Sequence, residues 1–200
     1  MPELLAGLKA FLLPAEEKVN PVYFAGRVLV YVLLLVWGYR FITYTWRSDY
    51  VMESFMHNIN LPFHEAGHLL FSPFGRFMHV LGGSLMQLLM PLVCLGAFLF
   101  PNRNAFAASA ALWWFAENLM DLAPYIGDAR AGELPLLGGV TGADVEDYHD
   151  WEYLLTRLGW LYSDQKIAAA AYMAGRWLMV LAFVWGAVLL SRQYRNLDMK

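Results

Sequence analysis

Cysteine and charge are both scarce in this chain of 200 residues. A single cysteine, Cys94, excludes a disulfide scaffold. Charged residues make up 16% of the chain, fewer than in typical soluble domains, and a net charge of -3 provides no basic surface for nucleic acid. Apolar residues take their place, because 59% of the chain is hydrophobic and the mean hydropathy is +0.42. This composition excludes a disordered chain and indicates an integral membrane protein in contact with the lipid bilayer.

Four apolar stretches are long enough to cross a bilayer, which requires about 20 mostly apolar residues. They cover residues 22–46, 79–100, 105–126 and 167–190. None alternates polar and apolar residues as the strands of a membrane barrel do. Gly82 and Gly83, in the second stretch, are expected to allow a neighbouring helix to approach closely. The sequence therefore predicts an all-α fold, a polytopic membrane helix bundle with four spanning helices.

A shorter segment lies between the first two stretches, at residues 52–72. Asn60 is of a type that caps helix N-termini, Pro62 fits the first turn, and Pro73 ends the helix. The roughly 12 residues in between would extend about 18 Å, too short to cross a bilayer. We therefore expect a short helix that is re-entrant, or one that continues upstream through a kink at Pro62 and crosses as a fifth span.

The whole chain is expected to form a single integral-membrane domain over residues 1–200. One helical stripe indicates an interfacial N-terminal segment at 1–21 and consists of Leu4, Leu5, Leu8, Phe11 and Leu12. The helical core covers 22–126, an acidic loop with an amphipathic helix covers 127–164, and the last span with a basic tail covers 165–200. The helix in the acidic loop is predicted from the spacing of Trp151, Leu154, Leu155, Leu158 and Leu161.

Charges near the helix ends predict the orientation. Arg192, Arg195 and Lys200 place the C-terminus in the cytoplasm, and Arg103 places the loop after the second span there too. Seven acids and one base lie between residues 128 and 152, so that loop is expected on the non-cytoplasmic side. The sequence thus predicts a protein of an inner or plasma membrane.

One short motif indicates chemistry. His64-Glu65-Ala66-Gly67-His68 matches H-E-x-x-H on a predicted helix. Four residues make about one helical turn, so both imidazoles project from one face and can hold one zinc ion. Glu65 can then act as the catalytic base on a metal-bound water, whose pKa the ion lowers toward about 7. Because ionisable groups near a bilayer are costly, a Zn²⁺ site for hydrolysis is favoured over a pair of core histidines.

A catalytic zinc needs a third protein ligand and one open position. Glu117 and Asp121 are one turn apart in the third stretch and are candidates, and Asp128 and His149 follow them. Spacing alone does not choose among the four. His149, which stands between two acids, is also a candidate donor to the oxyanion of a tetrahedral intermediate.

The order of three motifs resembles the site-2 protease family of intramembrane zinc metalloproteases. The first motif matches H-E-x-x-H fully, and residues 83–87 (GSLMQ) are similar to the family's G-P-x-x-N. Residues 121–128 (DLAPYIGD) are similar to its N-x-x-P-x-x-x-L-D-G, with one residue fewer between proline and aspartate and with Ala129 in place of glycine. The resemblance covers residues 60–130.

The resemblance implies a set of roles for the matching residues. His64, His68 and Asp128 would bind zinc, and Glu65 would be the general base. Gln87 and Asp121 would orient the substrate or the metal-bound water. The expected activity is hydrolysis of a peptide bond at or within the membrane, in a membrane protein or a membrane-associated peptide.

Two alternatives from other functional classes stay open. A non-catalytic metal-binding subunit or adaptor would need a closed site with four protein ligands. A metal-ion transporter would need a continuous polar path between helices, and five histidines are few for that role.

Overall fold

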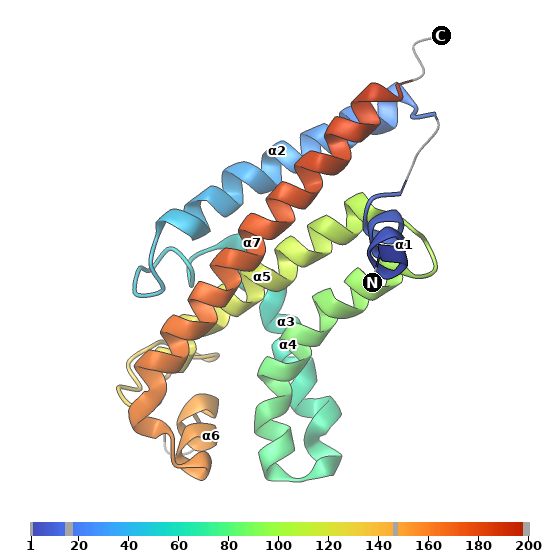
Figure 1. The fold of residues 1–200 in the computed structure, drawn as a ribbon. Coiled ribbons are helices and arrows are strands. Elements are labelled where there is room, and N and C mark those ends of the chain that lie inside the picture. Colours follow the sequence, from blue (N-terminus) through green and yellow to red (C-terminus); the bar gives the residue numbers. More distant parts are fainter. Residues whose placement is uncertain (1, 15–17, 146–147, 198–200) are drawn as a thin grey trace.

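The protein is all-helical in a computed structural model that describes residues 2–14, 18–145 and 148–197 (Figure 1). Within these ranges no β-strand forms, so the predicted all-α class is confirmed. Two single 3-10 turns, Ser72–Phe74 and Leu161–Ser163, accompany the α-helices. The helices are α1 (Pro2–Leu12), α2 (Pro21–Thr43), α3 (Phe55–Phe71), α4 (Arg76–Leu99), α5 (Ala105–Gly127), α6 (Asp150–Leu158) and α7 (Asp164–Arg195).

Three helical segments are long and apolar enough to cross a membrane. They are α2, α4 and the segment Leu161–Arg195, which contains α7. They support a membrane protein with three spans, where the sequence predicts four. The remaining candidate, α5, differs in composition because it carries Glu117, Asn118 and Asp121, all of which are buried inside the bundle.

The long helices α2, α5 and α7 run side by side in one bundle (Figure 1). The start of α2 meets the end of α7, where the Val19 N–H donates to the Asn196 carbonyl at 3.0 Å. Residues 128–145 and α6 lie at the opposite end. A core between α2, α5 and α7 includes the buried side chains of Phe41, Trp113, Met120, Tyr172 and Met179.

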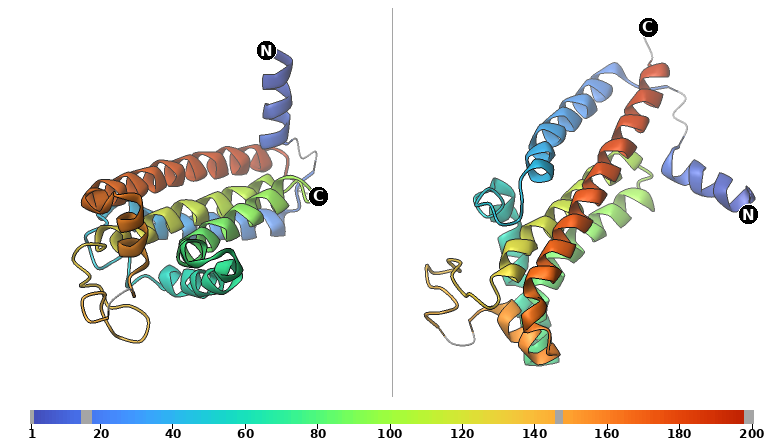
Figure 2. Two further views of the ribbon diagram at one scale, coloured as in Figure 1. Left: turned by 90° about the horizontal axis from the view of Figure 1, so that it is seen from below. Right: turned by 60° about the vertical axis from the view of Figure 1, so that its left-hand side comes forward.

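The N-terminal helix α1 projects away from the bundle (Figure 2). Its last turn is attached to the bundle, because the Trp185 indole donates to the Leu12 carbonyl at 2.9 Å and the Phe11 ring lies 5.4 Å from that of Phe100. The expected apolar stripe of α1 falls partly on the side chains of Leu4, Leu5 and Leu8, which lie outside the described residues.

The helix that carries the H-E-x-x-H motif begins earlier than the sequence predicts. Ser54 is the N-cap of α3, and its hydroxyl accepts the Met56 N–H at 3.3 Å. Asn60 was predicted to be the cap, but it is buried inside the helix, and its amide bonds α5 instead. Pro62 also lies within α3, which continues to Phe71 and has 17 residues. The prediction of a helix of roughly 12 residues is therefore wrong at its N-terminal end, and the alternative that the helix continues upstream of Pro62 is confirmed.

Candidate metal centre

The three ionisable residues of the motif lie together on α3. The ligand atoms of His64, Glu65 and His68 lie within 4.8 Å of one another. His64 is buried, His68 is half-buried and Glu65 is exposed. The one-turn spacing of the histidines therefore brings both imidazoles to one point, as the sequence predicts.

A carboxylate from another helix completes this group. Asp150 is the first residue of α6, and its Oδ2 lies 2.9 Å from His64 Nε2 and 3.2 Å from His68 Nε2. Burial would raise the pKa of Asp150, but the two imidazoles lower it to about 2. Burial lowers the pKa of His68, but the hydrogen bond to Asp150 outweighs this effect and raises it to about 9. One carboxylate oxygen thus faces both imidazoles, as the ligands of a single cation do.

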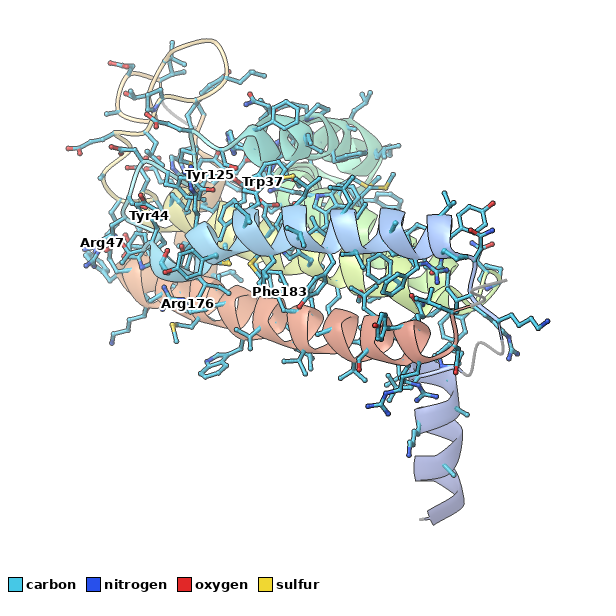
Figure 3. The ribbon with its side chains drawn as sticks, turned by 90° about the horizontal axis from the view of Figure 1, so that it is seen from above. Trp37, Tyr44, Arg47, Tyr125, Arg176 and Phe183 are labelled. Carbon is cyan, nitrogen blue, oxygen red and sulfur yellow. The ribbon has the colours of Figure 1, made fainter. Side chains whose placement is uncertain are left out.

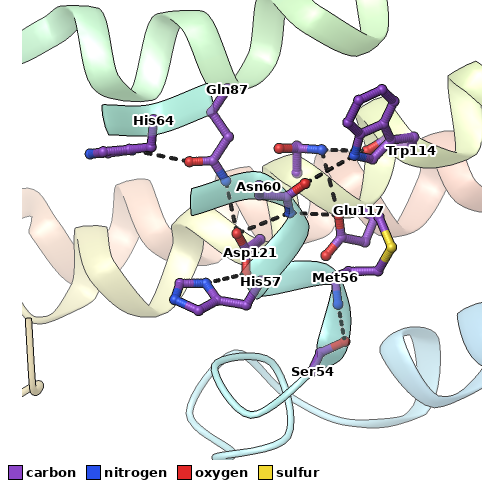
Figure 4. Close-up of polar contacts among 10 residues, drawn as sticks. Ser54, Met56, His57, Asn60, His64, Gln87, Trp114, Glu117 and Asp121 are labelled. Atoms are coloured by element: carbon purple, nitrogen blue, oxygen red, sulfur yellow. Dashed lines mark hydrogen bonds and ion pairs between the residues drawn. The ribbon is translucent and has the colours of Figure 1, made fainter. Parts of the chain in front are cut away.

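A hydrogen bond at Nδ1 of His64 determines that Nε2 is the nitrogen facing Asp150 (Figure 4). Gln87 Nε2 donates to Asp121 Oδ2 at 2.8 Å, which fixes the orientation of the Gln87 amide. Gln87 Oε1 therefore faces His64 Nδ1, at 3.1 Å, and because this oxygen only accepts, Nδ1 carries a proton. A metal that displaced the proton between Nε2 and Asp150 would then bind the Nε2 lone pair, an arrangement typical of metal-bound histidines.

His68 is held in the same way by a backbone carbonyl. Its Nδ1 donates to the His79 carbonyl at 2.9 Å, and His79 Nδ1 donates in return to the His68 carbonyl at 2.8 Å. This reciprocal pair joins the end of α3 to the first turn of α4. Gly83 lies on α4 against both rings, and a Cβ built there would be 2.5 Å from His64 Nε2 and 2.6 Å from His68 Nε2. The expected close approach of a helix at this glycine is confirmed.

The group opens into a cavity of about 650 Å³. This volume is within the range of sites that bind small ligands or short peptide segments. Glu65, His57 and Tyr125 contribute polar groups to its wall. Apolar surface comes from Leu61 and Val80, and the loop after α5 adds 135–138. The arrangement therefore combines three converging ligand atoms, an exposed carboxylate and space for a substrate.

Asp128, the ligand that the family resemblance implies, has its contacts in the segment after α5 and with His149. Its carboxylate accepts the N–H groups of Glu133 and Leu134, both at 3.0 Å, and lies 3.4 Å from His149 Nε2. Burial would raise the pKa of Asp128, but His149 and these N–H groups outweigh burial and lower it. The structure therefore does not bring Asp128 to the imidazoles of α3.

His149, the candidate oxyanion donor, is buried and caps α6. Its Nδ1 accepts the Glu152 N–H at 3.2 Å, so a neutral imidazole carries its proton on Nε2, the atom nearest Asp128. His149 does not line the cavity. Its position instead fixes the start of α6, where the next residue, Asp150, turns into the site.

Glu117 and Asp121 belong to a polar network behind the imidazoles (Figure 4). The Asn60 amide donates to Glu117 Oε2 at 2.9 Å and to Asp121 Oδ2 at 3.1 Å, and His57 Nδ1 lies 3.0 Å from Asp121 Oδ1. Glu117 is fully buried. Among the described contacts, these carboxylates reach His64 through Gln87 rather than directly.

The sequence does not indicate Asp150 or Tyr125 as functional residues. The Tyr125 hydroxyl accepts the Asp150 N–H at 2.9 Å, at the point where α5 and α6 meet. The available signal for Asp150 is its position next to His149 at the start of a predicted amphipathic helix. Comparison with known proteins adds no further assignment, because no family model, curated protein or solved structure matches this chain.

Proposed function

We propose that this protein is an integral-membrane zinc metallopeptidase that hydrolyses a peptide bond at or within the membrane. The proposal is carried by two imidazoles that each have Nδ1 engaged and direct Nε2 at one oxygen of Asp150. Two histidines and a carboxylate form a donor set that zinc accepts in hydrolases. Bound by His64, His68 and Asp150, zinc would polarise the substrate carbonyl and activate water.

Glu65 favours hydrolysis over a purely structural metal site. It is exposed in the cavity beside the ligand atoms, where it can take a proton from the attacking water and return it to the leaving amine. A structural zinc site is closed by four protein ligands, whereas this group of side chains opens into a cavity. The family resemblance supports the same roles for Glu65 and the two histidines, with Asp150 in place of Asp128 as the third ligand.

The arrangement of the helices supports a site near one membrane face. We infer that α5 is a fourth span, because its 23 residues run between the two ends of the bundle and its carboxylates face inward. We infer that α3 is re-entrant, because it is followed by a tight turn into α4.

The basic residues Arg103, Arg192 and Arg195 belong to the end opposite the site, so the C-terminus would be cytoplasmic. The site would then lie toward the outer face of an inner or plasma membrane.

The walls of the cavity support a polypeptide substrate. Leu61, Leu122 and Leu136 would contact apolar side chains, while the polar centre accommodates a backbone carbonyl. A membrane protein or a membrane-associated peptide would supply such a segment.

Replacement of the base tests the proposal. In purified protein reconstituted in lipid vesicles, we expect wild type to bind one zinc per chain and to cleave fluorogenic peptides taken from membrane segments. Glu65→Gln should retain the zinc but slow hydrolysis by about 10²- to 10⁴-fold, the usual contribution of a general base. The exposed Glu53 is a matched control, and Glu53→Gln should leave both measurements unchanged.

Two outcomes would contradict the peptidase. Hydrolysis that is unaffected by Glu65→Gln would exclude the proposed base. Zinc binding by wild type without cleavage of any membrane-derived peptide would favour the non-catalytic metal-binding subunit.

A further inference from the structure

We propose that Tyr125 is a catalytic residue of this site, whose hydroxyl donates a hydrogen bond to the oxyanion of the tetrahedral intermediate. This inference rests on the proposed peptidase function and adds a group that the motifs do not contain. Tyr125 lies in the last turn of α5, at the end of the bundle next to residues 128–145 (Figure 3). It lines the same cavity as Glu65 and the ligand group.

The Tyr125 ring is held in a fixed position. Its centroid lies 4.4 Å from that of His149 and 6.1 Å from that of His64. The neighbouring Pro124 and Ile126 are buried, so the backbone of this turn is anchored in the core. A donor fixed by packing before the reaction requires no reorganisation when charge develops on the substrate.

The Tyr125 hydroxyl lies next to the ligand group, at the first residue of α6. The hydroxyl oxygen accepts the Asp150 N–H at 2.9 Å, so one lone pair is engaged. The carboxylate of the same Asp150 contacts both imidazoles, so the hydroxyl lies one residue's width from the ligand atoms. A phenol normally loses its proton only near pH 10, so at neutral pH this group is a donor. A substrate carbonyl that binds beside Asp150 would accept a hydrogen bond from this hydroxyl.

Peptide hydrolysis develops negative charge on the carbonyl oxygen, which such a donor stabilises. The water oxygen forms a bond to the carbonyl carbon, the π electrons move to the carbonyl oxygen, and Glu65 takes the water proton. The resulting oxyanion is stabilised by the Tyr125 O–H. When the intermediate collapses, the C=O bond re-forms, the C–N bond breaks, and the amine leaves with the proton from Glu65. Removal of one such donor costs about 10²- to 10³-fold in kcat in other acyl-transfer enzymes.

A second tyrosine in the cavity provides a matched control. The Tyr148 hydroxyl donates to the Leu137 carbonyl at 2.8 Å, so its proton is already committed to the loop. Tyr148→Phe removes the same atom from the same cavity without removing a donor that is available to the substrate. A difference between the two phenylalanine variants therefore reports on the Tyr125 proton rather than on the cavity surface.

The test compares Tyr125→Phe with Tyr148→Phe in full-length protein in lipid vesicles. We expect Tyr125→Phe to lower kcat by about 10²-fold or more with little change in KM. Zinc affinity, measured by chelator competition, should stay within about threefold of wild type. A peptide phosphonate, which mimics the tetrahedral intermediate, should lose affinity in proportion to the loss in kcat/KM. Tyr148→Phe should leave kcat and phosphonate affinity close to wild type.

Three results would overturn the assignment. An unchanged kcat in Tyr125→Phe would exclude the donor role while leaving the peptidase itself intact. A fall in zinc affinity that parallels the fall in kcat would make Tyr125 a positioning residue that acts through Asp150. Absence of hydrolysis in the wild type would contradict the proposed function and this inference together.

Discussion

Two groups of histidine and aspartate meet at the start of α6, and they differ in which atoms remain available. In the sealed pair, Asp128 and His149 are both buried, and their polar atoms face backbone N–H groups or each other. In the open group, one nitrogen each of His64 and His68 faces one oxygen of Asp150, and all three residues line a cavity. The same residue types therefore serve a structural purpose in one place and form a candidate metal site in the other.

The direction of the hydrogen bond at Nδ1 explains this difference. His149 Nδ1 accepts a backbone N–H, so a neutral ring carries its proton on Nε2, which is buried 3.4 Å from Asp128 and has no lone pair for a metal. His64 and His68 instead donate from Nδ1, so a metal that displaced the proton between Nε2 and Asp150 would find the Nε2 lone pair of each ring. Whether a histidine can bind a metal thus depends on its neighbours, which belong to other helices.

The largest effect that separates the two groups is expected at Gly83. In Gly83→Ala the new Cβ would lie 2.5 Å from His64 Nε2, so both rings must move away from their common point. We expect zinc binding to be lost at concentrations that saturate wild type, as measured by isothermal titration calorimetry. Gly96→Ala, on the same helix in open space, is the control and should bind zinc normally. Normal zinc binding by Gly83→Ala would show that the two imidazoles do not hold the ion.

A smaller effect is expected at Gln87, which contacts the open group from behind. Gln87→Leu removes the acceptor of His64 Nδ1, so the ring can adopt either tautomer. Loss of such a partner typically lowers metal affinity by about 10- to 100-fold. Chelator competition would measure this change. Gln165→Leu serves as the control, because the Gln165 amide bonds the Gly127 carbonyl outside the cavity. Equal losses in the two variants would argue against a specific role for Gln87.

The sequence predicts those features of the fold that depend on a single helix. The all-α class and three of the predicted spans follow from apolar length alone. The start of α3 was not predictable in this way, because Asn60 has the chemistry of a cap but is bonded to carboxylates on α5. Pro62 likewise lies inside α3, and the helix has buried residues both before it, at Met56, and after it, at His64. Tertiary contacts override local signals at both residues.

The candidate site likewise has a part that the sequence predicts and a part that depends on tertiary contacts. His64, Glu65 and His68 are one turn of a single helix, so their spacing predicts their proximity. The third ligand comes from a segment 82 or more positions later in the chain, and nothing in the local sequence distinguishes Asp150 from Asp128. The two residues differ in their tertiary contacts, because Asp128 accepts the N–H groups of Glu133 and Leu134 whereas Asp150 contacts the imidazoles of α3.

Zinc binding by the two aspartate variants tests the central claim most directly. Zinc content and affinity would be measured on Asp150→Ala and Asp128→Ala, each purified in the same detergent and reloaded with zinc after chelation. If His64, His68 and Asp150 are the ligands, Asp150→Ala should lose tight zinc binding. Asp128→Ala should retain one zinc per chain and show only a lower melting temperature, because it leaves the buried His149 without its carboxylate partner. Loss of zinc in Asp128→Ala together with retention in Asp150→Ala would contradict this metal centre.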